Sequence, residues 1–413
     1  MSLLLKNIKS LVGILENNTS PLKGSDLSKL NTIDNAWLSI KDGRIDNYGS
    51  MLDIEEYIDT NDFDDYIDAK DKIVLPAFCD SHTHIVFAGS RENEFVDRIK
   101  GLSYEEIAKR GGGILNSAKK LHNTSEDELF DSAIRRIQEV KSKGTAAIEI
   151  KSGYGLNTQS ELKMLRVIKR LKKETDLIIK SNFLAAHAYP LEYRENHQGY
   201  IDLIINEMLP EIAKENLADY IDVFCEFGFF SVDETAQILE AGAKYGLKPK
   251  IHANQLNYSG GIQVGVKYNA VSVDHLECVG EEEINCLLHS KTIGTILPSA
   301  AYFLGLEYQP ARKMIDAGLA IALASDYNPG SSPSGNMPFI LSLACTQLKM
   351  TPEEALNACT INAAHAMEIA QEAGSISKGK VANIILTKNI PSLAYIPYAF
   401  GSDHIERVFI KGK

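Results

Sequence analysis

The sequence has 413 residues, of which 44% are hydrophobic, and its formal net charge is −12 at pH 7. A chain of this length can bury a large core, so we expect one large domain with a smaller one beside it. An acidic chain repels phosphate backbones and anionic lipids, which argues against nucleic acid or a membrane surface as a partner and favours a small molecule.

The cysteines and the apolar segments indicate where the protein works. Six cysteines are scattered without a Cys-x-x-Cys pair, which favours reduced thiols in a cytoplasmic protein over a disulfide framework. Lys6 and Lys9 interrupt the apolar N-terminus and no small-residue cleavage site follows, so we predict a first strand there rather than a signal peptide. No run of about 18 apolar residues occurs, so no transmembrane helix is predicted.

The two ends of the chain have the same character. Residues 1–72 read as short strands and polar turns, with a hairpin predicted in "AWLSIKDGRIDNYGS" around the turn at Asp42 and Gly43. Near the other end, "VANIILT" and "HIERVFIKGK" predict two more strands. We therefore predict a small β-sandwich domain formed by both termini, from residues 1–72 and 377–413.

The region between them, residues 73–376, alternates strand-like and helix-like segments. Ser231 and Glu234, for example, form a predicted capping box before one helix. Eight alternating units favour an α/β fold with a closed (β/α)8 TIM-type barrel over an open sheet, whose first strand would end in a Gly-rich dinucleotide loop rather than in His-Thr-His. The eight apolar runs are "IVLPAFCDSHTH", "TAAIEIKSG", "SNFLAAHA", "IDVFCEFG", "LKPKIHANQ", "AVSVDHLE", "TIGTILPSA" and "LAIALASDYNPG".

The predicted strand ends carry metal-binding chemistry. In such a barrel the C-terminal ends of all strands face one pocket, and side chains two apart on a strand point the same way. A lone histidine there is usually a packing residue, but five of the ten histidines fall at the ends of four strands. Imidazole and carboxylate ligands suit zinc or iron, so we predict a metal site. The residues are His82 and His84 on strand one, His187 on strand three, His252 on strand five, His275 on strand six and Asp326 on strand eight.

Other polar residues lie near these strand ends or on the predicted helices and loops. Asp80 precedes the His pair, and we expect it to orient a ligand through a hydrogen bond. Cys225 and Glu226 end strand four, where ordinary barrel lining is favoured over a bridge to a second metal. The remaining histidines fall on predicted helices or loops and receive no chemical role: His122, His197, His289, His365 and His404.

These motifs resemble a known family. "DSHTH", the two later histidines and the aspartate of "SDYNPG" are similar to the mononuclear amidohydrolase superfamily. "FAGSRENEF", "GGGI", "IKSGYGL", "LAAHA" and "SDYNPGSSPSGNMP" resemble the imidazolonepropionase family over nearly the whole chain. The resemblance implies hydrolytic ring opening of 4-imidazolone-5-propanoate to N-formimidoyl-L-glutamate in histidine degradation. It also implies a water activated by one divalent metal ion, zinc or iron, and a homodimer.

The resemblance also implies roles for individual residues. A guanidinium such as that of Arg91 recognises the propanoate carboxylate well, and the glycines beside Tyr154 let the backbone approach a ligand. The implied metal ligands are His82, His84, His252 and Asp326. The implied catalytic residues are His275, Asp326 and Gln255, and the implied substrate-binding residues are Arg91, Tyr154, His187, Gln255, Asn328, Gly330 and Ser331.

Gln255 departs from the family pattern, because many members carry glutamate three residues after the strand-five histidine. An amide is no general base, but it can hydrogen-bond the ring nitrogen or carbonyl. We therefore hypothesise that His275 polarises the carbonyl and that Asp326 takes the proton of the water.

Two other functions remain open at this point. One is a mononuclear amidohydrolase-type deaminase acting on a cytosine- or guanine-like heterocycle. Such enzymes generally need an acid at the position of Gln255, and Arg91 favours a substrate that bears a carboxylate. The other is an inactive metal-binding or scaffold protein, against which the complete ligand set argues.

Overall fold

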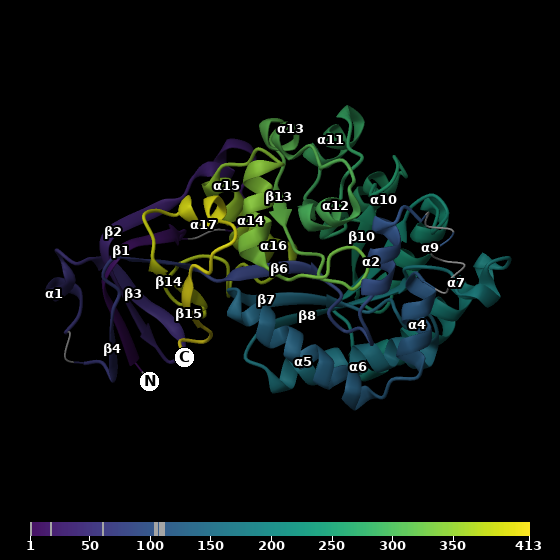
Figure 1. The fold of residues 1–413 in the computed structure, drawn as a ribbon, viewed down its shortest axis with the longest axis horizontal. Helices are drawn as coiled ribbons and strands as arrows, with labels where there is room; N and C mark the ends of the chain where they lie inside the picture. Colours follow the sequence, from purple (N-terminus) through teal and green to yellow (C-terminus); the bar gives the residue numbers. More distant parts are fainter. Residues whose placement is uncertain (1, 17–18, 60–61, 103–105, 107–111) are drawn as a thin grey trace.

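The computed structural model describes residues 2–16, 19–59, 62–102, 106 and 112–413. It contains an eight-stranded parallel sheet ringed by helices and a seven-stranded sheet to which both termini contribute (Figure 1). The predicted (β/α)8 barrel with a β-domain built from both ends of the chain is therefore confirmed.

Each of the eight predicted apolar runs supplies one barrel strand, and neighbours in sequence are neighbours in the sheet. The ring closes between the first strand and the segment after the last one, where the amide of His84 donates to the Tyr327 carbonyl (2.9 Å) and that of Asp326 donates to the His82 carbonyl (3.0 Å). The backbone hydrogen bonds that close the barrel are therefore made by predicted metal ligands, namely His82, His84 and Asp326. The strands are β6 (Phe78–Thr83), β7 (Thr145–Lys151), β8 (Ile178–Ala186), β9 (Tyr220–Cys225), β10 (Lys248–Ala253), β11 (Ser272–His275), β12 (Ile293–Ile296) and β13 (Ile321–Leu323).

Helices cover the outside of the barrel, as the period of their apolar positions predicts. Ser125 with Glu128 and Ser231 with Glu234 form capping boxes at α5 and α9, the second of which was predicted. The helices of this region are α2 (Glu92–Ile99), α4 (Ile114–His122), α5 (Glu126–Ser142), α6 (Thr158–Glu174), α7 (His197–Leu203), α8 (Leu209–Glu215), α9 (Val232–Ala243), α10 (Gly261–Lys267), α11 (Glu281–Leu288), α12 (Pro298–Leu304), α13 (Ala311–Asp316), α14 (Met337–Thr346), α15 (Pro352–Asn357) and α16 (Ala363–Ala366).

The terminal sheet runs in the order β15-β14-β5-β1-β2-β3, with β4 paired to β1. The predicted hairpin is present, and Asp42 and Gly43 take the positive φ values (50° and 75°) of its two-residue turn. Residues 73–76, assigned to the barrel domain from the sequence, lie in β5 of this sheet. The strands are β1 (Ser2–Ile14), β2 (Asn31–Lys41), β3 (Arg44–Ser50), β4 (Asp65–Asp68), β5 (Lys72–Pro76), β14 (Ile384–Asn389) and β15 (Ile405–Phe409), with short helices α1 (Ile54–Tyr57) and α17 (Tyr395–Tyr398) beside them.

The end of the barrel opposite the catalytic candidates is filled with small apolar side chains. Ala147 of β7 and Ala322 of β13 pack there with Ala363 and Ala364 of α16. Among the described residues, no helix combines the length and the apolar character needed to cross a membrane.

Candidate metal centre and substrate pocket

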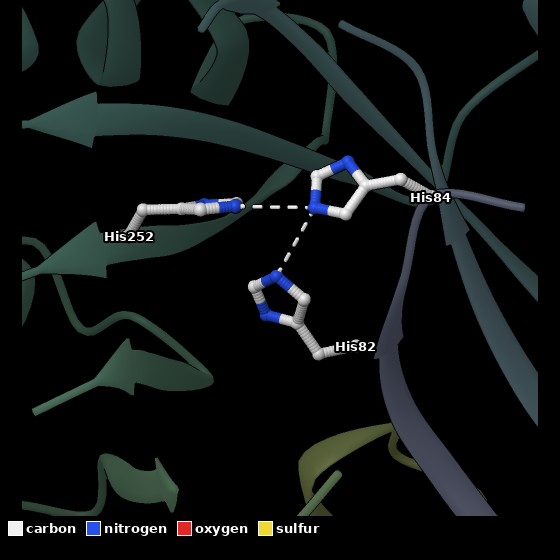
Figure 2. A group of neighbouring side chains, drawn as sticks. All are labelled: His82, His84 and His252. Carbon is white, nitrogen blue, oxygen red and sulfur yellow. Dashed lines mark hydrogen bonds between the residues drawn. The ribbon is translucent and has the colours of Figure 1, made fainter. Parts of the chain in front are cut away.

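Three histidine rings converge at the C-terminal end of the barrel. Figure 2 shows His82 of β6, and His84 just after this strand, pointing towards His252 of β10. The Nε2 atom of His84 lies 3.2 Å from that of His82 and 3.5 Å from that of His252. One oxygen of Asp326 lies 3.5 Å from the Nε2 atoms of both His82 and His84.

This arrangement fits a divalent metal. Two ligand atoms about 2.1 Å from zinc at a tetrahedral angle lie about 3.4 Å apart. The Nδ1–H of His82 donates to Asp274 (2.7 Å) and that of His252 donates to Asp222 (3.0 Å). The Nε2 atoms of these rings are therefore unprotonated, and their lone pairs face one another unless a cation lies between them. The Nδ1 atom of His84 is buried, with no hydrogen-bond partner in the described part of the chain.

Burial keeps the histidines in the form that binds metals. Desolvation lowers the pKa of His82, His84 and His252 below the ordinary value, so the rings are neutral at physiological pH. Burial raises the pKa of Asp326 to about 6, against the opposing effect of His275. His82, His275 and Asp326 form a second group whose potential ligand atoms lie within 4.8 Å of one another.

A buried ion-pair network that the sequence interpretation missed lies beneath these ligands. The Nζ atom of Lys151 is 2.7 Å from both Glu149 and Asp222 and 3.6 Å from Asp274. Burial by itself would lower the pKa of Lys151, but Asp222 and Glu149 raise it above the ordinary value. Lys250 pairs with Glu149 from the other side. Charged residues two apart in "IEIKSG", on a strand predicted to be buried, were a signal that could have revealed the network.

The histidine cluster opens into a cavity of about 550 Å³. Every substrate-binding residue that the sequence predicted lines it, and so do the catalytic candidates. The lining includes His84, Arg91, Tyr154, His187, His252, Gln255, His275, Asp326, Asn328, Gly330 and Ser331. The structure therefore brings together residues from seven separate sequence motifs in one pocket of the size of a small-molecule site.

Two guanidinium groups line the cavity. Arg91 donates through Nε (2.9 Å) and Nη2 to one oxygen of Glu94, whose other oxygen accepts the amide of Gly113 (3.0 Å). Arg98 donates to the Gly330 carbonyl (2.8 Å), and both arginines line the pocket. A Cβ at position 330 would lie 2.3 Å from Nη1 of Arg91, so a side chain there would displace this guanidinium. The sequence pointed to Arg91 but not to Glu94 or Arg98.

The loop after β13 is held by Asn328. Its amide nitrogen donates to the Asp326 carbonyl (2.7 Å) and to the Ser331 hydroxyl (2.7 Å), and its oxygen accepts the amides of Gly330 (2.7 Å) and Ser331 (2.8 Å). The Ser331 hydroxyl donates in turn to the Asp326 carboxylate (3.1 Å). These bonds use the whole hydrogen-bonding capacity of the amide, so Asn328 shapes the wall of the pocket and sets the orientation of Asp326.

His187 and Tyr154 form the opposite wall. The Nδ1–H of His187 donates to the Gly153 carbonyl (3.1 Å). The other ring nitrogen, Nε2, is therefore the one that can contact a ligand. Burial lowers the pKa of His187 to about 3, so the ring is neutral. Tyr154 is 3% exposed, and its ring centroid lies 5.6 Å from that of His187. Gly153 has a φ of 107°, and a Cβ there would lie 2.9 Å from His187, so glycine is needed.

Carboxylates position the two remaining candidates. Glu226 accepts the amides of Leu256 (2.9 Å) and Asn257 (3.2 Å) and so holds the loop that carries Gln255. This engagement supports the structural interpretation of Glu226 over a second-metal role. One oxygen of Glu277 lies 3.7 Å from Nδ1 of His275. Burial by itself would lower the pKa of His275, but Glu277 raises it above the ordinary value.

Asp80 accepts the backbone amide of the predicted ligand His82, and its oxygens also accept the amide (3.0 Å) and hydroxyl (2.5 Å) of Ser325, because the closing segment places Ser325 beside it. Asp80 therefore anchors the segment that leads to Asp326. In the motif "GGGI", Gly111 lies outside the described residues.

Comparison with known proteins agrees with this geometry. Residues 73–413 match the model of the amidohydrolase family. Imidazolonepropionases from Flavobacterium johnsoniae and Christiangramia forsetii are 57% and 54% identical to the chain over 413 residues, covering 100% of both proteins in each case. The chain belongs to the imidazolonepropionase family of amidohydrolases.

Solved structures of two other enzymes share the fold of this imidazolonepropionase family member. A triazine hydrolase variant superposes with a TM-score of 0.75 at 13% identity, over 100% of this chain and 94% of that chain. E. coli guanine deaminase gives 0.74 at 14% identity, over 100% of this chain and 98% of that chain. At such identities the likeness shows the fold alone.

Proposed function

We propose that this protein is an imidazolonepropionase, which hydrolyses 4-imidazolone-5-propanoate to N-formimidoyl-L-glutamate. The observation that carries the proposal is the placement of Arg91 and the convergent histidines in one cavity. That cavity can bind a carboxylate at Arg91 and a hydrolysable ring beside the histidines. The full-length identity to imidazolonepropionases supports the same substrate.

The proposed metal ligands are His82, His84, His252 and Asp326, whose donor atoms converge. A divalent metal bound there would act as a Lewis acid that lowers the pKa of water and polarises the carbonyl. Zinc and iron both suit this ligand set.

The protein side chains would perform the remaining work. Arg91 binds the propanoate, and Tyr154 and His187 fix the orientation of the ring, which removes part of the entropic barrier. Asp326 accepts the proton of the attacking water and passes it to the leaving ring nitrogen. His275 stabilises the negative charge that develops on the carbonyl oxygen. Gln255, Gly330 and Ser331 complete the substrate contacts, with Gln255 donating an amide hydrogen bond to the ring.

The remaining parts of the proposal concern the whole protein. We propose a homodimer in the cytoplasm, and the six free cysteines support a reducing compartment. We also propose that residues 1–72 with 377–413 and residues 73–376 act as two domains. β5, at the join, pairs with β1 and β14 of the terminal sheet.

A turnover assay tests the function. Metal-loaded protein is given freshly generated 4-imidazolone-5-propanoate, the loss of ultraviolet absorbance is followed, and the product is identified by mass spectrometry. Metal-dependent formation of formimidoyl-glutamate is expected. A folded, metal-loaded protein without turnover would contradict the proposal. Ammonia release from cytosine or guanine in parallel reactions would then favour the deaminase alternative.

A further inference from the structure

The centre of the barrel, directly beneath the histidines, contains a fully buried lysine. Lys151 of β7 reaches Asp222 of β9 (2.7 Å) and Asp274 of β11 (3.6 Å), and the side chains of all three are 0% exposed. These strands alternate around the barrel, so their inward side chains share one layer. One cation therefore faces two carboxylates that come from widely separated parts of the sequence.

Each of these carboxylates also holds one histidine. One oxygen of Asp222 accepts from Lys151, and the other lies 3.0 Å from Nδ1 of His252. In Asp274, the oxygen that faces Lys151 also lies 2.7 Å from Nδ1 of His82. Lys151 is thus linked to two of the converging histidines, His252 and His82, through one carboxylate each.

A buried carboxylate is stable only with charged or hydrogen-bonding partners, and it orients a histidine only while it stays in place. With a neutral residue at 151, Asp222 and Asp274 would face each other across the barrel without the shared cation. They would then turn away from each other, and this movement would loosen the rings that they hold. The histidine Nδ1–H bonds depend in this way on a charge that touches neither ring directly.

We propose that Lys151 is a positioning residue of the metal site, which holds Asp222 and Asp274 so that His252 and His82 present unprotonated Nε2 atoms to one metal ion. The proposal rests on the metal site of the proposed function. The proposal is tested by metal affinity rather than by turnover, so a wrong substrate assignment would not contradict it.

Lys250 provides a matched control. It is also fully buried in the barrel and shares Glu149 with Lys151, but it lies 5.2 Å from the centre of the Tyr220 ring rather than against Asp222 or Asp274. Lys151→Met and Lys250→Met therefore remove the same charge from the same core, and only the first removes the partner of the carboxylates that hold histidines. A loss of general stability affects both variants, whereas a loss of ligand orientation affects one.

The experiment measures the Zn²⁺ affinity of the two full-length variants by competition with a chromogenic chelator. The visible spectrum of the Co²⁺-loaded proteins gives a second readout of ligand geometry. Lys151→Met is expected to bind Zn²⁺ about 10- to 100-fold more weakly, as is typical when a partner of a ligand is lost, and to show an altered Co²⁺ spectrum. Lys250→Met is expected to keep both properties, even if both variants unfold at a lower temperature.

Two results would overturn the proposal: unchanged Zn²⁺ affinity in folded Lys151→Met, or an equal loss of affinity in Lys250→Met. Lys151→Gln covers the case in which the methionine variant does not fold, because its amide keeps an N–H donor in the same layer without the charge. The same weakening of Zn²⁺ binding is expected for it, and wild-type affinity in this variant would likewise overturn the proposal.

Discussion

The two ends of the barrel are built on opposite principles. At the C-terminal end the backbone itself is unusual, since His275, Leu276 and Asp326 have positive φ values of 88°, 66° and 53°, which cost energy in residues other than glycine. At the N-terminal end, Ala147 and Ala322 pack with the alanines of α16 in an apolar cluster. One end accepts strain to place chemical groups, and the other stabilises the fold.

Unsatisfied polar atoms also occur at the C-terminal end. Near the cavity, buried polar atoms remain without a hydrogen-bond partner within the described ranges, among them Nδ1 of His275, Oε2 of Glu277 and Oε1 of Gln309. Such groups are costly unless a ligand, a metal or water satisfies them. We therefore expect substitutions at the C-terminal end to lower activity more than stability, and substitutions at the N-terminal end to do the reverse.

The largest effect is expected from Asp326→Asn. An amide cannot accept the proton of the attacking water, so kcat should fall by about 10²- to 10⁴-fold. Steady-state rates and bound metal are measured together, with Asp131→Asn on the exposed face of α5 as the control. Full turnover in a variant that keeps its metal would disprove the proton-transfer role of Asp326.

Arg91→Lys should have the next largest effect. Lysine keeps the charge but lacks the planar fork, so it loses part of both the Glu94 pair and the substrate carboxylate contact. We expect kcat/KM to fall by about 10- to 100-fold, mainly through KM, as for the loss of a charged hydrogen bond. Arg170→Lys on α6 is the matched control, and an unchanged KM in Arg91→Lys would remove Arg91 from the binding site.

Gly374→Ala tests the other end of the barrel. Gly374 has a φ of 88°, and a Cβ there would lie 2.7 Å from Ala364 and 2.9 Å from the Thr360 carbonyl. The variant should lose about 1–3 kcal/mol of unfolding free energy by denaturant titration, with kcat nearly unchanged. Gly379→Ala separates strain from collision, because Gly379 has a similar φ of 83° but open space around it. A large loss of kcat in Gly374→Ala would contradict the expectation that substitutions at the N-terminal end lower stability more than activity.

The smallest effect concerns acid stability at the N-terminal end. Burial, with a smaller effect of Lys380, lowers the pKa of His365 to about 4. Between about pH 6.5 and pH 4 the unfolded chain binds the proton and the folded chain does not, so stability falls as the pH drops through this window. His365→Gln should flatten this part of a pH–stability curve slightly, without changing stability at pH 8. An unchanged slope would show that His365 is not protonated differently in the two states.

Local patterns in the sequence were sufficient for much of this architecture. The eight strands, the Asp42–Gly43 hairpin and the Ser231 capping box depend on neighbours within a few residues, and all are present. The pocket lining was predicted as well, because a barrel brings all strand ends to one face. The expectation for Asp80 covered its hydrogen bond to His82 but not its second partner, Ser325, which lies 245 residues away in the sequence.

The sequence by itself determined the alternation of strands and helices and the residue types at the strand ends, since both follow from short-range periodicity. Only the tertiary structure decided which carboxylate holds which group: Asp274 with His82, Asp222 with His252, Glu94 with Arg91 and Glu226 with the Gln255 loop. The residues next to a carboxylate in the sequence do not indicate which group it will pair with. Its pairing depends on which strands become neighbours and on the burial that makes an unpaired charge too costly to keep.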